Sequence, residues 1–121
     1  MSKTILIVDD SESIREVVNA TLENAGYNVL MGVDGIDALK HLDGQDISLV
    51  ISDLNMPNKD GIELIKDIRA EEVYQFVPIL LLTTESQSEK KMEAKAAGAT
   101  GWIVKPFVQE KLLSTVRKVM R

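Results

Sequence analysis

The chain has 121 residues and no cysteine, which suits one domain with a single hydrophobic core and excludes disulfides and thiolate metal sites. Nineteen acidic residues against fourteen basic ones give a formal net charge of −5, which disfavours binding to nucleic acid or to anionic membranes. The apolar runs are too short for a signal peptide or a membrane span, so we expect a cytoplasmic, monomeric protein with one domain over residues 1–121.

Short aliphatic or β-branched runs alternate along the chain with segments of helical period. This alternation is typical of βα repeats, which build a mostly parallel sheet covered by helices on both faces. The predicted strands are Thr4 to Asp9, Asn28 to Met31, Ser48 to Asp53, Ile79 to Thr83 and Trp102 to Lys105. They predict an α/β fold, a flavodoxin-like (βα)5 three-layer sandwich whose five parallel strands have the order 2-1-3-4-5.

The helix expected after the first strand has a capping box at its start, formed by Ser13 and Glu16. Gly26 can end this helix. Between them, apolar residues recur at intervals of three and four and predict one buried stripe: Ile14, Val17, Val18, Thr21, Leu22 and Ala25. A second capping box, Ser86 with Glu89, opens the helix that follows the fourth strand, and the buried face of this helix is expected to be mostly alanine.

Aspartates end two of the most apolar predicted strands, since Asp9 and Asp10 follow "ILIV" and Asp53 follows "LVIS". Open α/β sheets bind ligands at the carboxyl ends of their strands, so we expect the three carboxylates to converge. Two unit charges about 4 Å apart repel by roughly 4 kcal/mol at an effective dielectric constant near 20, so the group requires a cation. Oxygen ligands favour Mg²⁺, and the sequence therefore predicts a Mg²⁺ site.

Helix capping is the alternative role for the aspartate pair, because a single aspartate after a strand most often caps the next helix. The pair alone fits capping and ligand binding about equally well. Ser13 already offers a cap, however, and Asp53 arrives from a different strand. These two observations favour a binding site.

Thr83 and Lys105 come at the ends of the fourth and fifth predicted strands. A threonine there usually reflects β propensity, and a lysine usually faces solvent. Beside an acidic pocket, however, a hydroxyl and an ammonium group provide a hydrogen-bond donor and a neutralising charge for a phosphoryl group in transfer.

These residues stand in four ordered motifs, "VDD", "SDLNMPNKDG", "LLTTES" and "GWIVKPF". The set resembles the receiver domain of two-component response regulators, most of all the CheY-like single-domain chemotaxis regulators, and the resemblance spans the whole chain. It implies that Asp53 is the phosphoacceptor, with Asp10 a direct Mg²⁺ ligand and Asp9 a ligand through water. It further implies that the metal is bound by Asp53 and by the main-chain carbonyl of Asn55.

The resemblance also implies roles at the fourth and fifth strands. Lys105 would contact the phosphoryl oxygens, and its bond to Pro106 would be cis, which proline permits at low cost. Thr83 and Trp102 would form a switch pair, in which Thr83 moves toward the phosphoryl group and Trp102 turns inward. The residues alone give Trp102 no special role. The face that changes would be the fourth helix, fifth strand and fifth helix.

The resemblance implies a phosphoryl donor from outside the chain, a histidine kinase, because the single histidine, His41, lies in the expected second helix away from the strand ends. It implies a target bound by docking, such as a flagellar motor switch component, and leaves room for a dedicated phosphatase. The chain would catalyse its own phosphorylation and dephosphorylation without being a conventional enzyme. Asn55 and Glu85 occupy the positions that tune dephosphorylation and imply a lifetime of seconds rather than hours.

Other functions fit the sequence less well. A phosphatase of the haloacid dehalogenase kind needs a second aspartate two positions after the first, where this chain has Ser11 and Asn55. A flavin-binding module would have its phosphate repelled by Asp9 and Asp10. A receiver that only docks, without phosphorylation, is disfavoured by the intact set of site residues. A phosphorelay or phosphate-sink receiver outside chemotaxis stays open.

Overall fold

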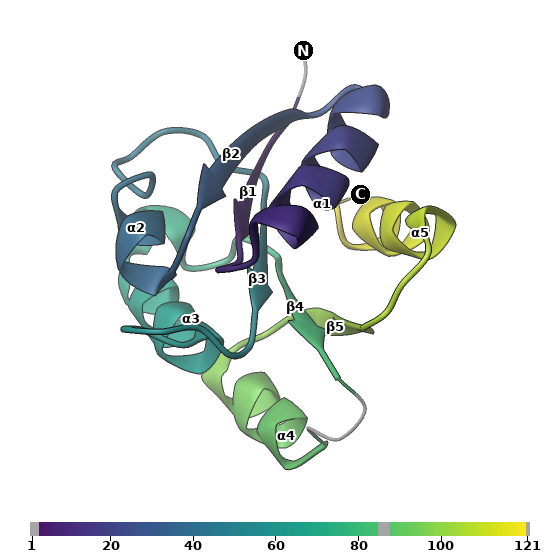
Figure 1. Cartoon of the computed structure of the whole chain (residues 1–121). Coiled ribbons are helices and arrows are strands. Elements are labelled where there is room, and N and C mark those ends of the chain that lie inside the picture. Colours follow the sequence, from purple (N-terminus) through teal and green to yellow (C-terminus); the bar gives the residue numbers. More distant parts are fainter. Residues whose placement is uncertain (1–2, 85–87, 121) are drawn as a thin grey trace.

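A five-stranded parallel sheet lies between two layers of helices in the computed structural model, which describes residues 3–84 and 88–120 (Figure 1). The strands are β1 (Thr4–Val8), β2 (Asn28–Gly32), β3 (Leu49–Asp53), β4 (Ile79–Thr83) and β5 (Gly101–Val104). Their order is β2-β1-β3-β4-β5, and each neighbouring pair is parallel. The predicted fold class and strand order are confirmed.

Helices cover both faces of the sheet, with α1 and α5 on one side and α2, α3 and α4 on the other (Figure 1). The helices are α1 (Glu12–Asn24), α2 (Gly35–Leu39), α3 (Gly61–Ala70), α4 (Ser88–Ala97) and α5 (Gln109–Val119), with a 3₁₀ turn, η1 (Glu72–Tyr74), after α3. No helix formed by the described residues is long and apolar enough to cross a membrane.

Alternate residues of each central strand enter different cores. In β1, Ile5 and Ile7 pack with α1 and α5, whereas Leu6 and Val8 pack on the side of α3 and α4. All residues of β3 and β4 are buried. This burial on both faces explains why these strands are continuous apolar runs rather than alternating patterns.

Strand ends differ from the predicted ends by about one residue. β1 stops at Val8, although the Asp9 amide still donates to the Gly32 carbonyl at 3.1 Å. β5 stops at Val104, although the Lys105 amide donates to the Thr83 carbonyl at 2.6 Å. The hydrogen-bonded ladder therefore runs one residue past β1 and β5, so Asp9 and Lys105 follow their strands, whereas Asp53 and Thr83 are the last residues of β3 and β4.

The predicted capping box at the start of α1 is wrong. The N-cap is Ser11, whose hydroxyl accepts a hydrogen bond from the Ile14 amide at 3.3 Å, and Ser13 lies inside the first turn. The Asp9 carboxylate accepts from the Ser11 amide at 2.9 Å and so sets the point at which the chain enters the helix. The second predicted box contains Ser86, which lies outside the described residues.

The apolar stripe of α1 is narrower than predicted. Val18, Thr21 and Leu22 are buried, but Val17 is half exposed and Ala25 is exposed. Gly26 follows the end of the helix with φ of +98°, a conformation that glycine adopts without strain, so the predicted helix end is confirmed. The buried face of α4 is predicted to be mostly alanine, and of its alanines Ala94 is fully buried, Ala97 is half-buried and Ala96 is exposed.

Candidate functional site

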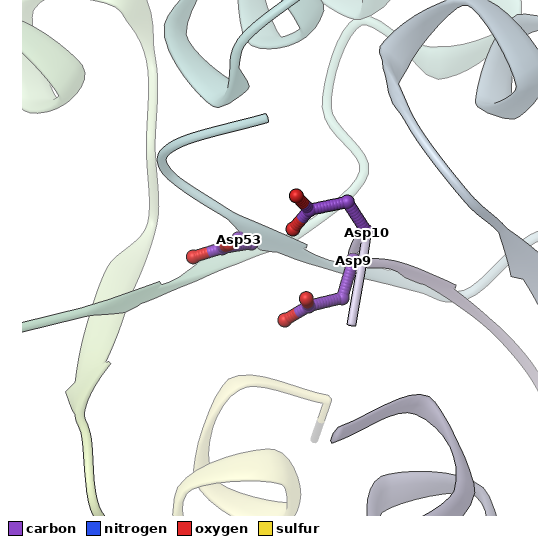
Figure 2. A group of neighbouring side chains, drawn as sticks. All are labelled: Asp9, Asp10 and Asp53. Atoms are coloured by element: carbon purple, nitrogen blue, oxygen red, sulfur yellow. The ribbon is translucent and has the colours of Figure 1, made fainter. Parts of the chain in front are cut away.

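The carboxylates of Asp9, Asp10 and Asp53 extend into one shared space at the carboxyl ends of β1 and β3 (Figure 2). The pairing of β1 with β3 aligns Val8 with Ser52, so the residues that follow lie side by side. One oxygen from each carboxylate lies within 4.8 Å of the others. The structure therefore brings together the three aspartates that the sequence placed at strand ends.

Asp9 is the most buried member of this group, with no exposed surface. Its Oδ1 accepts from the Ser11 amide, whereas its Oδ2 has no hydrogen-bond partner among the described residues. Burial raises the pKa of Asp9 above its ordinary value, and the charges of Asp53 and Asp10 raise it further, against the Ser11 hydrogen bond and the charge of Lys105. A buried carboxylate oxygen that accepts no hydrogen bond and has only an ion pair with Lys105 at 3.5 Å suits a bound cation.

Lys105 reaches this group from the turn after β5. Its Nζ donates to Oδ1 of Asp53 at 3.0 Å and lies 3.5 Å from Oδ2 of Asp9. One ammonium thus contacts two of the three carboxylates and compensates part of their charge. The Lys105–Pro106 peptide bond is cis, as expected.

Thr83 ends β4, beside the strand that carries Asp53, and is 1% exposed. Its Oγ1 has no hydrogen-bond partner among the described residues. Leaving a buried hydroxyl unpaired costs about 1–3 kcal/mol, so the position suits a ligand oxygen that is bound only in another state.

Asn55 is exposed and lies two residues after Asp53, in the loop between β3 and α3. Gly61, the first residue of α3, packs against the end of β3. A Cβ at this position would lie 2.6 Å from the Asp53 carbonyl oxygen. The loop that carries Asn55 therefore starts and ends against the strand that carries the candidate phosphoacceptor.

Arg15 supports the aspartate turn in a way that the sequence did not predict. Its Nη1 donates to the main-chain carbonyl of Asp9 at 2.6 Å. The feature of the sequence that could have indicated this role is an arginine in the first turns of the helix that follows the aspartate pair. By holding this carbonyl from α1, Arg15 fixes the backbone from which Asp9 and Asp10 project.

His41 lies away from the site, as expected, but in the turn after α2 rather than inside that helix. Its Nε2 is 3.1 Å from the carbonyl oxygen of Met31 in β2. This contact ties the turn to the edge strand of the sheet. It gives His41 a structural role.

Trp102 lies on β5 and is 38% exposed, and Nζ of Lys91 in α4 is 5.6 Å from the centroid of its ring. That distance is within the range of a cation–π interaction, which holds the ring against α4. The ring is thus partly exposed and lies against Lys91 of α4. An inward turn of Trp102 stays a prediction.

The capping alternative for the aspartate pair does not account for this geometry. Ser11, not Asp9 or Asp10, accepts the cap hydrogen bond of α1. Asp9 contributes one oxygen to the entry of the helix and leaves the other facing Lys105 and the carboxylate group. A set of three carboxylates, with a buried oxygen that accepts no hydrogen bond among the described residues, fits a hard divalent cation such as Mg²⁺.

An Asp10→Asn protein is expected to be more stable than the parent in the absence of metal. The change removes one of three close negative charges, and because Asp10 is exposed the gain in unfolding free energy is roughly 1 kcal/mol. Added Mg²⁺ should stabilise the parent more than this variant. Thermal unfolding with EDTA and with Mg²⁺ checks both, and a lower melting temperature of the metal-free variant would contradict the repulsion.

Asp46→Asn is the matched control for Asp10→Asn. Asp46 is exposed and precedes β3, at the amino ends of the strands, whereas the carboxylate group lies at their carboxyl ends. The same change of charge at that position should leave the melting temperature in EDTA and its response to Mg²⁺ close to those of the parent.

Comparison with known proteins places these features in a family. Residues 5–117 match the response regulator receiver domain. Chemotaxis protein CheY-3 of Vibrio cholerae is 40% identical over 116 residues, which are 95% of this chain and 89% of that protein. The high-resolution structure of chemotaxis response regulator CheY4 of Vibrio cholerae is 49% identical in sequence to this chain, with a TM-score of 0.93, and the match covers 98% of this chain and 99% of that one.

A further similar structure holds a metal. The receiver domain of sensor histidine kinase PA1611 from Pseudomonas aeruginosa is 28% identical with a TM-score of 0.91, covering 99% of this chain and 98% of that one. It is described as having a magnesium ion coordinated in its active site cleft.

Proposed function

This chain belongs to the response regulator receiver domain family of two-component signalling, and from that membership we propose that it accepts a phosphoryl group on Asp53. One observation carries the proposal. The Asp53 carboxylate lies beside an ammonium group, Lys105 Nζ at 3.0 Å, and beside two further carboxylates at the strand ends. This surrounding suits a nucleophile that must approach a highly charged phosphoryl group.

The proposed reaction forms a bond between an Asp53 oxygen and phosphorus and breaks the phosphorus–nitrogen bond of a phosphohistidine. The imidazole leaves with the electron pair of the broken bond. Lys105 neutralises charge on the phosphoryl oxygens, and Thr83 offers its buried hydroxyl, which lacks a partner among the described residues, as a donor to the product. Attack by water on the resulting aspartyl phosphate would regenerate Asp53.

Asp9, Asp10, Asp53 and the carbonyl of Asn55 would hold Mg²⁺ in this proposal, which is supported by the close approach of the three carboxylates and by the Asp9 oxygen that accepts no hydrogen bond among the described residues. The metal, when bound, supplies positive charge that stabilises the transferring phosphoryl group. Asp9 and Asp10 would orient it from the β1–α1 turn, whose backbone Arg15 supports. The magnesium described for the receiver domain of PA1611 agrees with this assignment.

The donor would be a histidine kinase, docked beside Lys105. A groove of about 430 Å³ lies there, lined by Ile14, Val17, Thr84, Lys105, Pro106 and Phe107. Its apolar wall reaches from α1 to the turn before α5 and so borders the phosphoryl site. The half-exposed side chain of Val17, which the stripe of α1 does not bury, belongs to this wall.

The output proposed for this chain is chemotaxis, because the similar proteins from Vibrio cholerae are chemotaxis regulators. The target would be a protein such as a flagellar motor switch component, in the cytoplasm, with a dedicated phosphatase as a further partner. A phosphorelay or phosphate-sink role would appear instead as phosphotransfer without binding to a motor component. Pull-down of the phosphorylated form with purified motor switch protein separates these outcomes.

The test of the proposal is direct phosphorylation. Incubated with Mg²⁺ and acetyl phosphate or its kinase, the protein should gain one phosphoryl group, located by mass spectrometry in the peptide that contains Asp53. EDTA should prevent the reaction, and the label should decay on a scale of seconds rather than hours. Label on another residue, or a label that persists for hours, would count against the assignment. Glu85, one of the two residues from which the lifetime of the phosphorylated form is expected, lies outside the described residues.

Beryllofluoride, which mimics the phosphoryl group on Asp53, is expected to change the fluorescence of Trp102. In this structure the ring is partly exposed and lies against Lys91, so an inward turn of the ring would alter both its exposure and its contact with that ammonium group. Fluorescence and iodide quenching measure this. A Thr83→Ala protein should lose the response while still binding Mg²⁺, and an unchanged spectrum of the parent would refute the switch.

A further inference from the structure

The loop between β3 and α3, residues 54–60, is fixed at its ends and less so in its middle. The Leu54 amide donates to the Leu82 carbonyl at 3.2 Å, and the Gly61 amide donates to the Leu54 carbonyl at 2.9 Å. Between these bonds, Asn55 and Asn58 are exposed. Within the loop the Lys59 amide donates to the Pro57 carbonyl at 2.7 Å, a bond that does not reach the sheet, so the candidate metal ligand Asn55 lies in the less firmly held part of the loop.

A side-chain hydrogen bond ties the middle of this loop to the turn between β2 and α2. Asn58 Nδ2 donates to Oδ2 of Asp34, in the turn between β2 and α2, at 2.7 Å. Asn58 has φ of +68°, a left-handed conformation that asparagine tolerates better than most residues. The side chain thus leaves a tight turn and is held by a neighbouring turn.

Asp34 is itself fixed on the other side of this contact. Its Oδ1 accepts from the Asp37 amide at 2.8 Å and caps α2. The hydrogen bond from Asp37, followed by that from Asn58, lowers the pKa of Asp34 below its ordinary value. The ionised carboxylate therefore joins the first turn of α2 to the loop that follows Asp53.

Close backbone packing accompanies this hydrogen bond. A Cβ at Gly35 would lie 2.7 Å from the carbonyl oxygen of Lys59 and 2.8 Å from its Cβ, so glycine permits the two turns to touch. Lys59 in turn pairs with Asp67 of α3 through Nζ and Oδ2 at 2.5 Å. Residues 34–35 and 58–59 thus form one contact that continues into α3.

We propose that Asp34 is a positioning residue for the metal centre, acting through Asn58 on the loop that carries Asn55. The inference rests on the proposed function, because it assigns Asp34 a part in binding Mg²⁺ at that site. Asn58 lies three residues after Asn55 and five after Asp53. Holding this segment before the metal arrives reduces the conformational freedom that binding must remove, and so favours binding.

Asn58→Asp tests the inference because loss of positioning and simple electrostatics predict opposite changes in the affinity for Mg²⁺. Aspartate tolerates the left-handed backbone but places a second carboxylate against Asp34, so the hydrogen bond is lost. The added negative charge alone should strengthen the attraction for Mg²⁺. Loss of positioning should instead raise the Kd for Mg²⁺, measured by calorimetry, about threefold to tenfold, the effect of one hydrogen bond.

The exchange Asp34→Asn with Asn58→Asp is the rescue. The new amide at position 34 can cap α2 through its oxygen and donate through its nitrogen to the new carboxylate at position 58. Net charge equals that of the parent, and the Kd should return to within about twofold of the parent value. The amide signals of Asn55 and its neighbours in metal-free NMR spectra should shift in Asn58→Asp and return in the exchange.

Asp34→Ser provides an independent variant, since serine keeps the cap of α2 but is too short to reach Asn58. It should weaken Mg²⁺ binding, whereas Asp46→Ser, which removes the same charge at the amino ends of the strands, should not. Unchanged or tighter Mg²⁺ binding by Asn58→Asp, or failure of the exchange to restore it, would overturn the inference and leave the proposed function intact. Absence of Mg²⁺ binding by the parent would overturn both.

Discussion

An Asp53→Asn protein is expected to accept no measurable phosphoryl group from its kinase or from acetyl phosphate. The labelling rate should fall by about a thousandfold or more, because an amide is uncharged and is not a nucleophile. The fold should survive, since the amide oxygen can still accept the hydrogen bond that Lys105 donates to Asp53 Oδ1. Rates of incorporation measured with labelled donor, parent against variant, give the result.

Asp46→Asn is the matched control for the loss of labelling, because it makes the same chemical change at an exposed carboxylate before β3. It should be labelled at the rate of the parent. Labelling of Asp53→Asn at a comparable rate would contradict the assignment. Residual slow labelling, if mapped to Asp10, would fit the geometry, since the two carboxylates share one space (Figure 2).

The fold could be predicted because burial on both faces leaves a plain signal in the sequence. β3 and β4 are buried throughout, so their runs of apolar residues predict strands of a parallel sheet. The exact ends of strands are harder to predict from sequence, because ladder hydrogen bonds continue to Asp9 and Lys105 although both side chains are polar. The first polar residue after an apolar run therefore does not show where the backbone pairing of the strand ends.

The first helix shows why a local motif can mislead. Ser11 and Ser13 are both acceptable caps by residue type. The choice between them depends on the hydrogen bond from the Ser11 amide to Asp9, which places the chain for a helix that starts at Glu12. The same hydrogen bond occupies one oxygen of the candidate metal ligand, so the cap and the site share a residue.

The candidate site was predictable where it depends on strand order and not where it depends on contacts between loops. Asp9, Asp10 and Asp53 meet because β1 and β3 are neighbours, which the order of the sheet implies. The Asp34–Asn58 hydrogen bond requires two turns to pack at a particular separation, and no spacing in the sequence encodes that. Residues that support a site are therefore harder to identify from sequence than the residues that form it.

A Lys105→Met protein is expected to depend on Mg²⁺ for stability more than the parent does. Methionine keeps much of the apolar length of lysine but removes the ammonium group that contacts Asp53 and Asp9. Without metal, the unfolding free energy should fall by about 2–3 kcal/mol, somewhat less than for a fully buried pair because Lys105 is partly exposed. Added Mg²⁺ should recover much of this loss, as measured by urea unfolding with EDTA and with Mg²⁺.

Loss of Lys105 should also slow phosphorylation at saturating Mg²⁺ by about a hundredfold, the effect of removing one charge-stabilising donor from a transition state. Exposed Lys66→Met in α3 is the matched control and should change neither property. A variant as stable as the parent in EDTA would show that the ammonium group does not compensate the carboxylates. Phosphorylation at the parent rate would remove Lys105 from the mechanism.

The effect of Lys105→Met should depend on pH in a direction set by Asp9. The pKa of Asp9 is raised in the folded protein, chiefly by burial, so the folded state holds its proton more tightly than the unfolded state does. Ionisation of Asp9 therefore costs stability above the raised pKa, and this cost disappears as pH falls toward the ordinary carboxyl value of 3.8. Lys105 offsets part of the cost only while Asp9 is charged.

In EDTA, the difference in unfolding free energy between parent and Lys105→Met should thus be greatest near neutral pH and should shrink as pH falls through the raised pKa of Asp9. A difference that stays constant over this range would place the stabilising contact of Lys105 elsewhere than on the buried carboxylate.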